Sequence, residues 1–83
     1  MLNTNKVVER VKEVLKDEYR TKVLDKNVAY ELGMSISRLS SIKSRSLVPY
    51  DELTTFCIKY KVNTNWLFFG VGIMEMDYAK EDM

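Results

Sequence analysis

The sequence predicts an all-α fold, a compact bundle of five short helices. Apolar residues recur at spacings of three and four along most of the chain, and no segment alternates as a half-buried strand does. The chain has 83 residues, of which 46% are hydrophobic, enough for one small core. We therefore expect one domain over residues 1–74, followed by an acidic segment, 75–83, that is either a C-terminal tail or the start of a linker.

A short polar bridge separates the first two expected helices. The first spans about residues 4–18, and its apolar face is Val7, Val8, Val11, Val14 and Leu15. Its candidate N-caps are Asn3, Thr4 and Asn5. The second helix spans about 25–32. Asp25 is the expected cap at its start, and Gly33 is expected to end it in a left-handed conformation.

Three more helices complete the expected bundle. Ser35 is the expected cap of the third, which runs to about Ser44. The fourth opens with Pro49 in its first turn, where the missing amide hydrogen costs nothing. It carries the apolar stripe Leu53, Phe56, Cys57 and Tyr60, on which Cys57 is expected to be a small buried hydrophobe. The fifth spans about residues 64–69 and ends at Gly70.

The third helix is unusual because six serines lie between Ser35 and Ser46, although serine is a mediocre helix former. On a helical wheel, Leu39 and Ile42 share the core side. Four serines share the opposite side, and we call them the serine face: Ser37, Ser40, Ser41 and Ser44. Arg38 and Lys43 flank this face. From residue 32 to residue 50 there are three basic residues and no acid.

A helix with small polar side chains on one face and cations on both flanks is suited to the major groove of DNA. The expected base-facing residues are Ser35, Ile36, Ser37, Ser40, Ser41 and Ser44. The expected phosphate-contacting residues are Lys26, Arg38, Lys43, Arg45 and Tyr50, with free backbone amides at the start of the fourth helix contributing. The alternative is that the serines simply face water.

The stretch DKNVAYELGMSISRLSSIKS, residues 25–44, resembles the helix-turn-helix of phage repressors. The matching positions are the small Ala29, the turn glycine Gly33 and the apolar Val28, Leu32, Met34, Leu39 and Ile42. The second half resembles the end of the DNA-binding domain of phage CI-like repressors, which have a lambda-repressor-like fold. Its matching residues are Arg45, Pro49-Tyr50-Asp51-Glu52-Leu53, Phe56-Cys57, Trp66-Leu67, Gly70, Gly72 and Met74.

This resemblance covers roughly residues 6–74 and implies a transcriptional repressor. Such a protein would place the third helix in the major groove and bind a pseudo-palindromic operator as a homodimer. Where relatives often carry glutamine, this chain has Ile36, which would contact a thymine methyl group or pack toward the second helix. Phe69, Val71 and Ile73 would serve self-association or be buried beneath the C-terminal tail.

Composition argues against other classes of protein. With no histidine and one cysteine, the sequence offers no disulfide framework, no ordinary zinc site and no nucleophile–base pair, so we expect no enzyme, cofactor or small-molecule substrate. The longest apolar run, residues 66–74, is far shorter than the roughly 20 residues that cross a bilayer. We expect a cytoplasmic protein. The alternative function is a protein-interaction module, such as an antirepressor or an antitoxin-like subunit.

Overall fold

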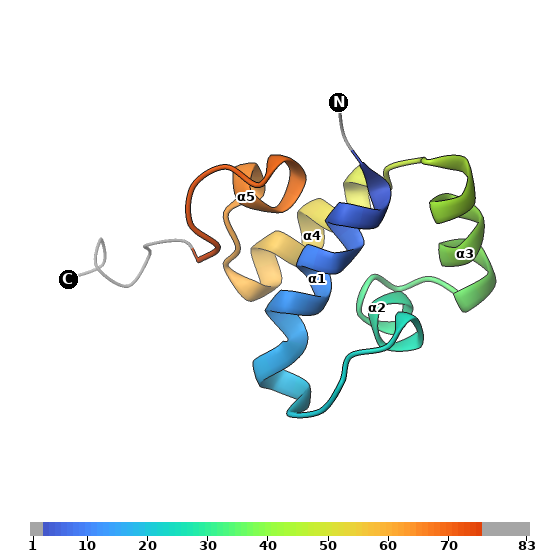
Figure 1. The fold of residues 1–83 in the computed structure, drawn as a ribbon, viewed down its shortest axis with the longest axis horizontal. Helices are drawn as coiled ribbons and strands as arrows, with labels where there is room; N and C mark the ends of the chain where they lie inside the picture. The colour runs from blue at the N-terminus through green and yellow to red at the C-terminus, as the bar shows by residue number, and fades with distance from the viewer. Residues whose placement is uncertain (1–2, 76–83) are drawn as a thin grey trace.

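The structure is a computed structural model that describes residues 3–75, and it confirms the all-α prediction (Figure 1). Within those residues it contains five helices and no strand: α1 Thr4–Tyr19, α2 Asp25–Glu31, α3 Ile36–Arg45, α4 Tyr50–Tyr60 and α5 Thr64–Phe69. An isolated antiparallel bridge joins Val62 to Glu75. Glu75 is the first residue of the expected acidic segment, and its remainder, 76–83, lies outside the described residues.

Two of the predicted helix starts are confirmed and two are corrected. The side chains of Asn3 and Ser35 accept hydrogen bonds from backbone amides of α1 and α3, as expected of N-caps. The prediction that Asp25 caps α2 is wrong, because Leu24 holds the cap position. The Asn27 side chain accepts the Leu24 amide hydrogen at 2.8 Å, which leaves the Asp25 carboxylate free for other partners. Pro49 is the N-cap of α4 rather than a residue of its first turn.

Helix ends in this chain use both glycine and larger residues in the left-handed region. Gly33 follows α2 with φ +70°, as predicted, and the Met34 amide returns to the Ala29 carbonyl at 2.9 Å. Arg20, Ser46 and Lys61 end α1, α3 and α4 with φ between 55° and 58°. A side chain in this region costs roughly 1–2 kcal/mol, so these three ends store strain that glycine would remove.

The core is assembled around α1, which packs against α2, α3 and α5. Val11 and Leu15 of α1 are fully buried, together with Val28 of α2. Leu39 and Ile42 attach α3, with exposed fractions of 1% and 7%. Cys57 is buried as predicted, and burial raises the pKa of its thiol. Burying a leucine or valine side chain contributes about 1.5–3 kcal/mol, so this shared core holds the five helices together.

The carboxylate of Glu31 joins α1, α2 and α4 in a nearly buried position. Tyr60 donates its hydroxyl to Oε1 at 2.7 Å, and Tyr19 donates its hydroxyl to Oε2 at 2.9 Å. Burial opposes the charge of Glu31, but the hydrogen bonds from Tyr60 and Tyr19, with the nearby Lys59 ammonium, outweigh it and hold the pKa of this carboxyl below its ordinary value. The charged carboxylate therefore stays paired inside the fold at neutral pH.

Arg10 ties α5 to α1. Its Nη1 donates to the carbonyl oxygens of Leu67 at 3.0 Å and Phe68 at 3.3 Å, in the last turn of α5, where a cation is favourable. Gly70 ends α5 beside this guanidinium, and a Cβ at that position would lie 2.8 Å from Arg10 Nη2. Glycine is favoured there both by the close approach of the guanidinium and by φ +74°.

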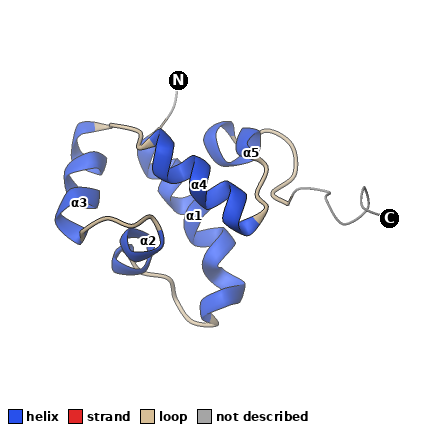
Figure 2. Ribbon diagram, turned by 180° about the vertical axis from the view of Figure 1, so that it is seen from behind, coloured by secondary structure: helices blue, strands red, loops and turns tan. Residues whose placement is uncertain are grey.

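Helices α3 and α5 lie at opposite ends of the bundle, with α1 and α4 between them. Both views show this separation (Figures 1 and 2). No helix within residues 3–75 has the length and hydropathy needed to cross a bilayer. The arrangement gives the domain two distinct exposed surfaces, one on α3 and one around α5.

Replacing Lys61 with glycine is expected to stabilise the domain. Lys61 ends α4 with φ +57°, and glycine adopts this conformation without the steric cost. We expect the free energy of unfolding to rise by about 1 kcal/mol, which corresponds to a Tm increase of roughly 4–8 °C for a domain of this size. Calorimetry or thermal circular dichroism measures the change.

The control for this substitution is Lys16→Gly, at an exposed position inside α1. There the backbone is ordinary helix, so glycine should lower the free energy of unfolding by about 1 kcal/mol. If both variants are destabilised alike, the left-handed conformation of Lys61 stores no strain.

Candidate functional site

The candidate site is the exposed side of α3. This helix is rotated about its axis as the helical wheel predicts. Leu39 and Ile42 are buried against the bundle, whereas all four residues of the serine face are exposed. Ser35, at the start of the helix, is also exposed, although its hydroxyl oxygen already accepts the Arg38 amide hydrogen at 3.0 Å. The exposed face of α3 thus presents short hydroxyl side chains that donate and accept hydrogen bonds.

Ile36 stands at the leading edge of this face. Its side chain is 57% exposed, so packing toward α2 covers less than half of it. The exposed part is an apolar surface beside the serines. Ile36 was expected either to contact a ligand or to pack toward α2, and this degree of exposure favours the first.

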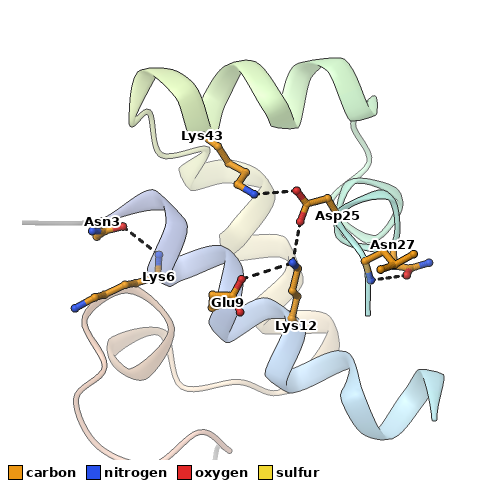
Figure 3. A network of polar contacts seen from close by, with 8 residues as sticks. Asn3, Lys6, Glu9, Lys12, Asp25, Asn27 and Lys43 are labelled. Atoms are coloured by element: carbon orange, nitrogen blue, oxygen red, sulfur yellow. Dashed lines mark hydrogen bonds and ion pairs between the residues drawn. The ribbon is translucent and has the colours of Figure 1, made fainter. Parts of the chain in front are cut away.

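The cations on the flanks of α3 are engaged by carboxylates from other helices. On one side, Arg38 Nη1 lies 2.7 Å from Glu52 Oε2 of α4. On the other side, Lys43 Nζ lies 2.8 Å from Asp25 Oδ2 of α2. Asp25 lies between Lys43 and Lys12, whose Nζ is 2.9 Å from Oδ1 (Figure 3). The flanks of the serine face are therefore ion pairs rather than open cations.

The two carboxylates are held in their charged form. The Lys43 ammonium, followed by that of Lys12, lowers the pKa of Asp25 by hydrogen bonding, against the opposing effect of burial. The Arg38 guanidinium, followed by a backbone hydrogen bond, lowers the pKa of Glu52. In turn the hydrogen bond to Asp25 raises the pKa of Lys12. All of these pairs are charged at neutral pH.

Asp25 and Glu52 belong to this site although neither was among the residues expected from the sequence. The segment from residue 32 to residue 50 holds no acid, so its three basic residues suggested a positive local surface. Asp25 and Glu52 lie outside that segment and meet α3 through ion pairs that reach across from α2 and α4. One signal in the sequence was that both acids lie in the first turn of a helix, where a carboxylate is favourable.

Lys26 and Arg45 differ from the flanking cations. Both side chains are exposed, and in the part of the chain that the structure describes no carboxylate forms an ion pair with either. Lys26 lies in the first turn of α2 and Arg45 is the last residue of α3. Among the expected phosphate-contacting residues, these two keep an uncompensated charge.

Tyr50 corrects the expectation of a free amide at the start of α4. Its backbone N–H donates to the Val48 carbonyl at 3.0 Å, so it is not available to a phosphate. The side chain is 56% exposed, and its ring centroid lies 5.6 Å from that of Phe68. Any contact of Tyr50 with a ligand therefore involves its phenol.

The segment before α4 is anchored to α1, because Thr4 donates its hydroxyl to the Leu47 carbonyl at 2.8 Å.

A second exposed surface lies around α5, far from α3. We call it the C-terminal apolar patch: Phe69, Val71 and Ile73, with exposed fractions of 60%, 61% and 71%. The Phe69 ring centroid lies 6.3 Å from that of Phe68, and the Phe68 ring in turn packs at a tilt of 40° against the ring of Tyr50. Exposed apolar side chains this close together in the sequence are typical of an interaction surface.

No protein-family model, no curated protein and no solved structure matches this chain. Within the described residues no cluster of histidine, cysteine, aspartate or glutamate could hold a metal ion. The exposed side of α3 and the C-terminal apolar patch are therefore the features of the molecule that bear on its function.

Asp25 is expected to contribute stability that disappears in acid. Because its pKa is lowered in the folded state, this contribution is fully present above the ordinary carboxyl pKa and is lost as the pH falls through the lowered value. Asp25→Asn should lower the free energy of unfolding by about 1 kcal/mol at neutral pH, since partly exposed pairs contribute little. The difference from the unmodified protein should begin to shrink as the pH falls below the ordinary carboxyl pKa and should vanish below the lowered pKa, as denaturant titrations at several pH values can measure.

Asp17→Asn is the matched control. Asp17 is exposed in the last turns of α1, and its carboxylate forms no ion pair among the described residues. The free energy of unfolding of this variant should stay within about 0.5 kcal/mol of the original, as is usual for surface substitutions. Equal losses for the two variants would mean that the Asp25 bridge does not stabilise the fold.

Proposed function

We propose that this chain is a sequence-specific DNA-binding domain that acts as a dimeric transcriptional repressor of the phage or prophage type. One observation carries the proposal: α3 exposes four serines on the side opposite Leu39 and Ile42, with no acid on the helix itself. Small side chains allow a helix to approach base edges closely, and hydroxyl groups pair with either donors or acceptors there. The resemblance of residues 25–44 to a phage-repressor helix-turn-helix points the same way.

In this proposal α3 lies in the major groove and the serine face contacts base edges. The exposed part of Ile36 is suited to a thymine methyl group. Lys26 and Arg45, whose charges are uncompensated, contact backbone phosphates and set the register of the helix on the duplex. Arg38 and Lys43 contact phosphates as well, once they leave their carboxylate partners.

Dimerisation would use the C-terminal apolar patch. It lies at the end of the bundle opposite α3, so two copies could meet there while each keeps its serine face exposed (Figure 1). A two-fold dimer reads two half-sites in opposite orientations, which makes the operator a pseudo-palindrome.

The test is selection of bound DNA from a random duplex library, at low and at moderate salt. The proposal predicts enrichment of a pseudo-palindrome whose half-sites are separated by a whole number of helical turns, that is, by about 34–36 Å or a multiple of it. Retention without sequence selection would mean that the domain needs a further dimerisation partner to bind specifically. Absence of retention at both salt concentrations would contradict DNA binding.

Ser37→Trp should abolish binding to the selected duplex, because the indole would hold α3 away from the base edges. Ser37 is exposed, so Tm should stay within a few degrees of its original value. The control is Thr54→Trp, a small exposed residue of α4 replaced by the same bulky group. Fluorescence anisotropy with labelled duplex should show binding lost only in the first variant. If Ser37→Trp binds normally, α3 does not enter the groove.

The exposure of the C-terminal apolar patch also favours a second candidate, a protein-interaction module of the antirepressor or antitoxin type. In that case α3 would have no role in DNA binding. Ionic strength separates the two functions: DNA affinity falls with a log–log slope of about −0.9 per phosphate neutralised, whereas an apolar protein contact responds little to salt. The serine face argues against this candidate, since serine is depleted in protein interfaces.

A further inference from the structure

We propose that Asp25 and Glu52 limit the affinity of this domain for DNA, because they compete with backbone phosphates for Lys43 and Arg38. The inference rests on the proposed function and adds to it a role for two acids outside the serine face. These carboxylates occupy the cations on both flanks of α3, where a bound duplex would place its phosphates.

The pair between Arg38 and Glu52 is positioned for such a competition. The Arg38 side chain is 50% exposed, so it is accessible to a ligand, yet its Nη1 is held 2.7 Å from the Glu52 carboxylate. A phosphate approaching Arg38 therefore meets the guanidinium together with a negative charge. Attraction to the cation is offset by repulsion from the carboxylate, and the net gain is smaller than for an unpaired arginine.

The second pair can exchange partners with little cost to the fold. Asp25 is bound by Lys43 at 2.8 Å and by Lys12 at 2.9 Å, so it keeps one cation when Lys43 turns to a phosphate (Figure 3). Glu52, in the first turn of α4, keeps the favourable end of the helix dipole when Arg38 leaves. Neither carboxylate is left buried without compensation.

A competition of this kind acts on phosphates and not on bases. It should therefore weaken binding to the selected duplex and to an unrelated duplex by the same factor. The domain would gain a lower background of non-specific binding, and the ratio between the two affinities would be unchanged.

The test is Glu52→Gln, which removes the charge and keeps the shape of the side chain. Anisotropy titrations at one salt concentration should give Kd values roughly three- to fivefold lower for both duplexes, the range expected when a partly exposed ion pair no longer has to break. Asp17→Asn is the control, because it raises the net charge equally but lies at the end of α1 away from α3 (Figure 1). It should change Kd less than about twofold, since distant exposed charges are screened.

A double-mutant cycle with Arg38→Ala isolates the competition. In the Arg38→Ala background, Glu52→Gln should no longer tighten binding, because no guanidinium is left to release. If Glu52→Gln still tightens DNA binding in that background, the tighter binding comes from the change in net charge alone, and the inference is overturned. Unchanged or weaker binding of Glu52→Gln alone would also overturn it, showing that Glu52 positions Arg38 for DNA. If the unmodified domain binds no duplex, the proposed function fails, and this inference with it.

Discussion

The burial of Leu39 and Ile42 is the constraint on which the functional surface depends. These two side chains attach α3 to the bundle, and their direction fixes which residues of the helix face outward. A shift by one residue would turn the helix by about 100° and carry the serine face toward the core, where unpaired hydroxyls are costly. The burial of these two apolar side chains thus sets the direction in which the serine face points, although they lie on the opposite side of the helix.

The charges around α3 follow from the same packing. Once α3 is docked, Arg38 points toward α4 and Lys43 toward α2, and each meets a carboxylate there. The result is a neutral polar face bordered by ion pairs, with open positive charge left at Lys26 and Arg45. A surface of this kind suits a ligand that supplies its own negative charges and can replace the carboxylates.

The bundle also keeps its two exposed surfaces apart. Arg10 holds the last turn of α5 against α1, and this contact positions the C-terminal apolar patch at the end opposite α3 (Figure 2). Self-association and DNA binding would therefore not compete for the same residues.

Local patterns in the chain are enough to predict the helices, the left-handed turn at Gly33 and the serine face, because periodicity and capping act over a few neighbouring residues. The prediction that Asp25 caps α2 is wrong, because the Asn27 side chain accepts the Leu24 amide hydrogen and leaves Asp25 free. Which acids reach Arg38 and Lys43 depends instead on how the helices pack. Ion pairs depend on distances of a few ångströms between helices that are remote in the chain, and no local pattern carries that information.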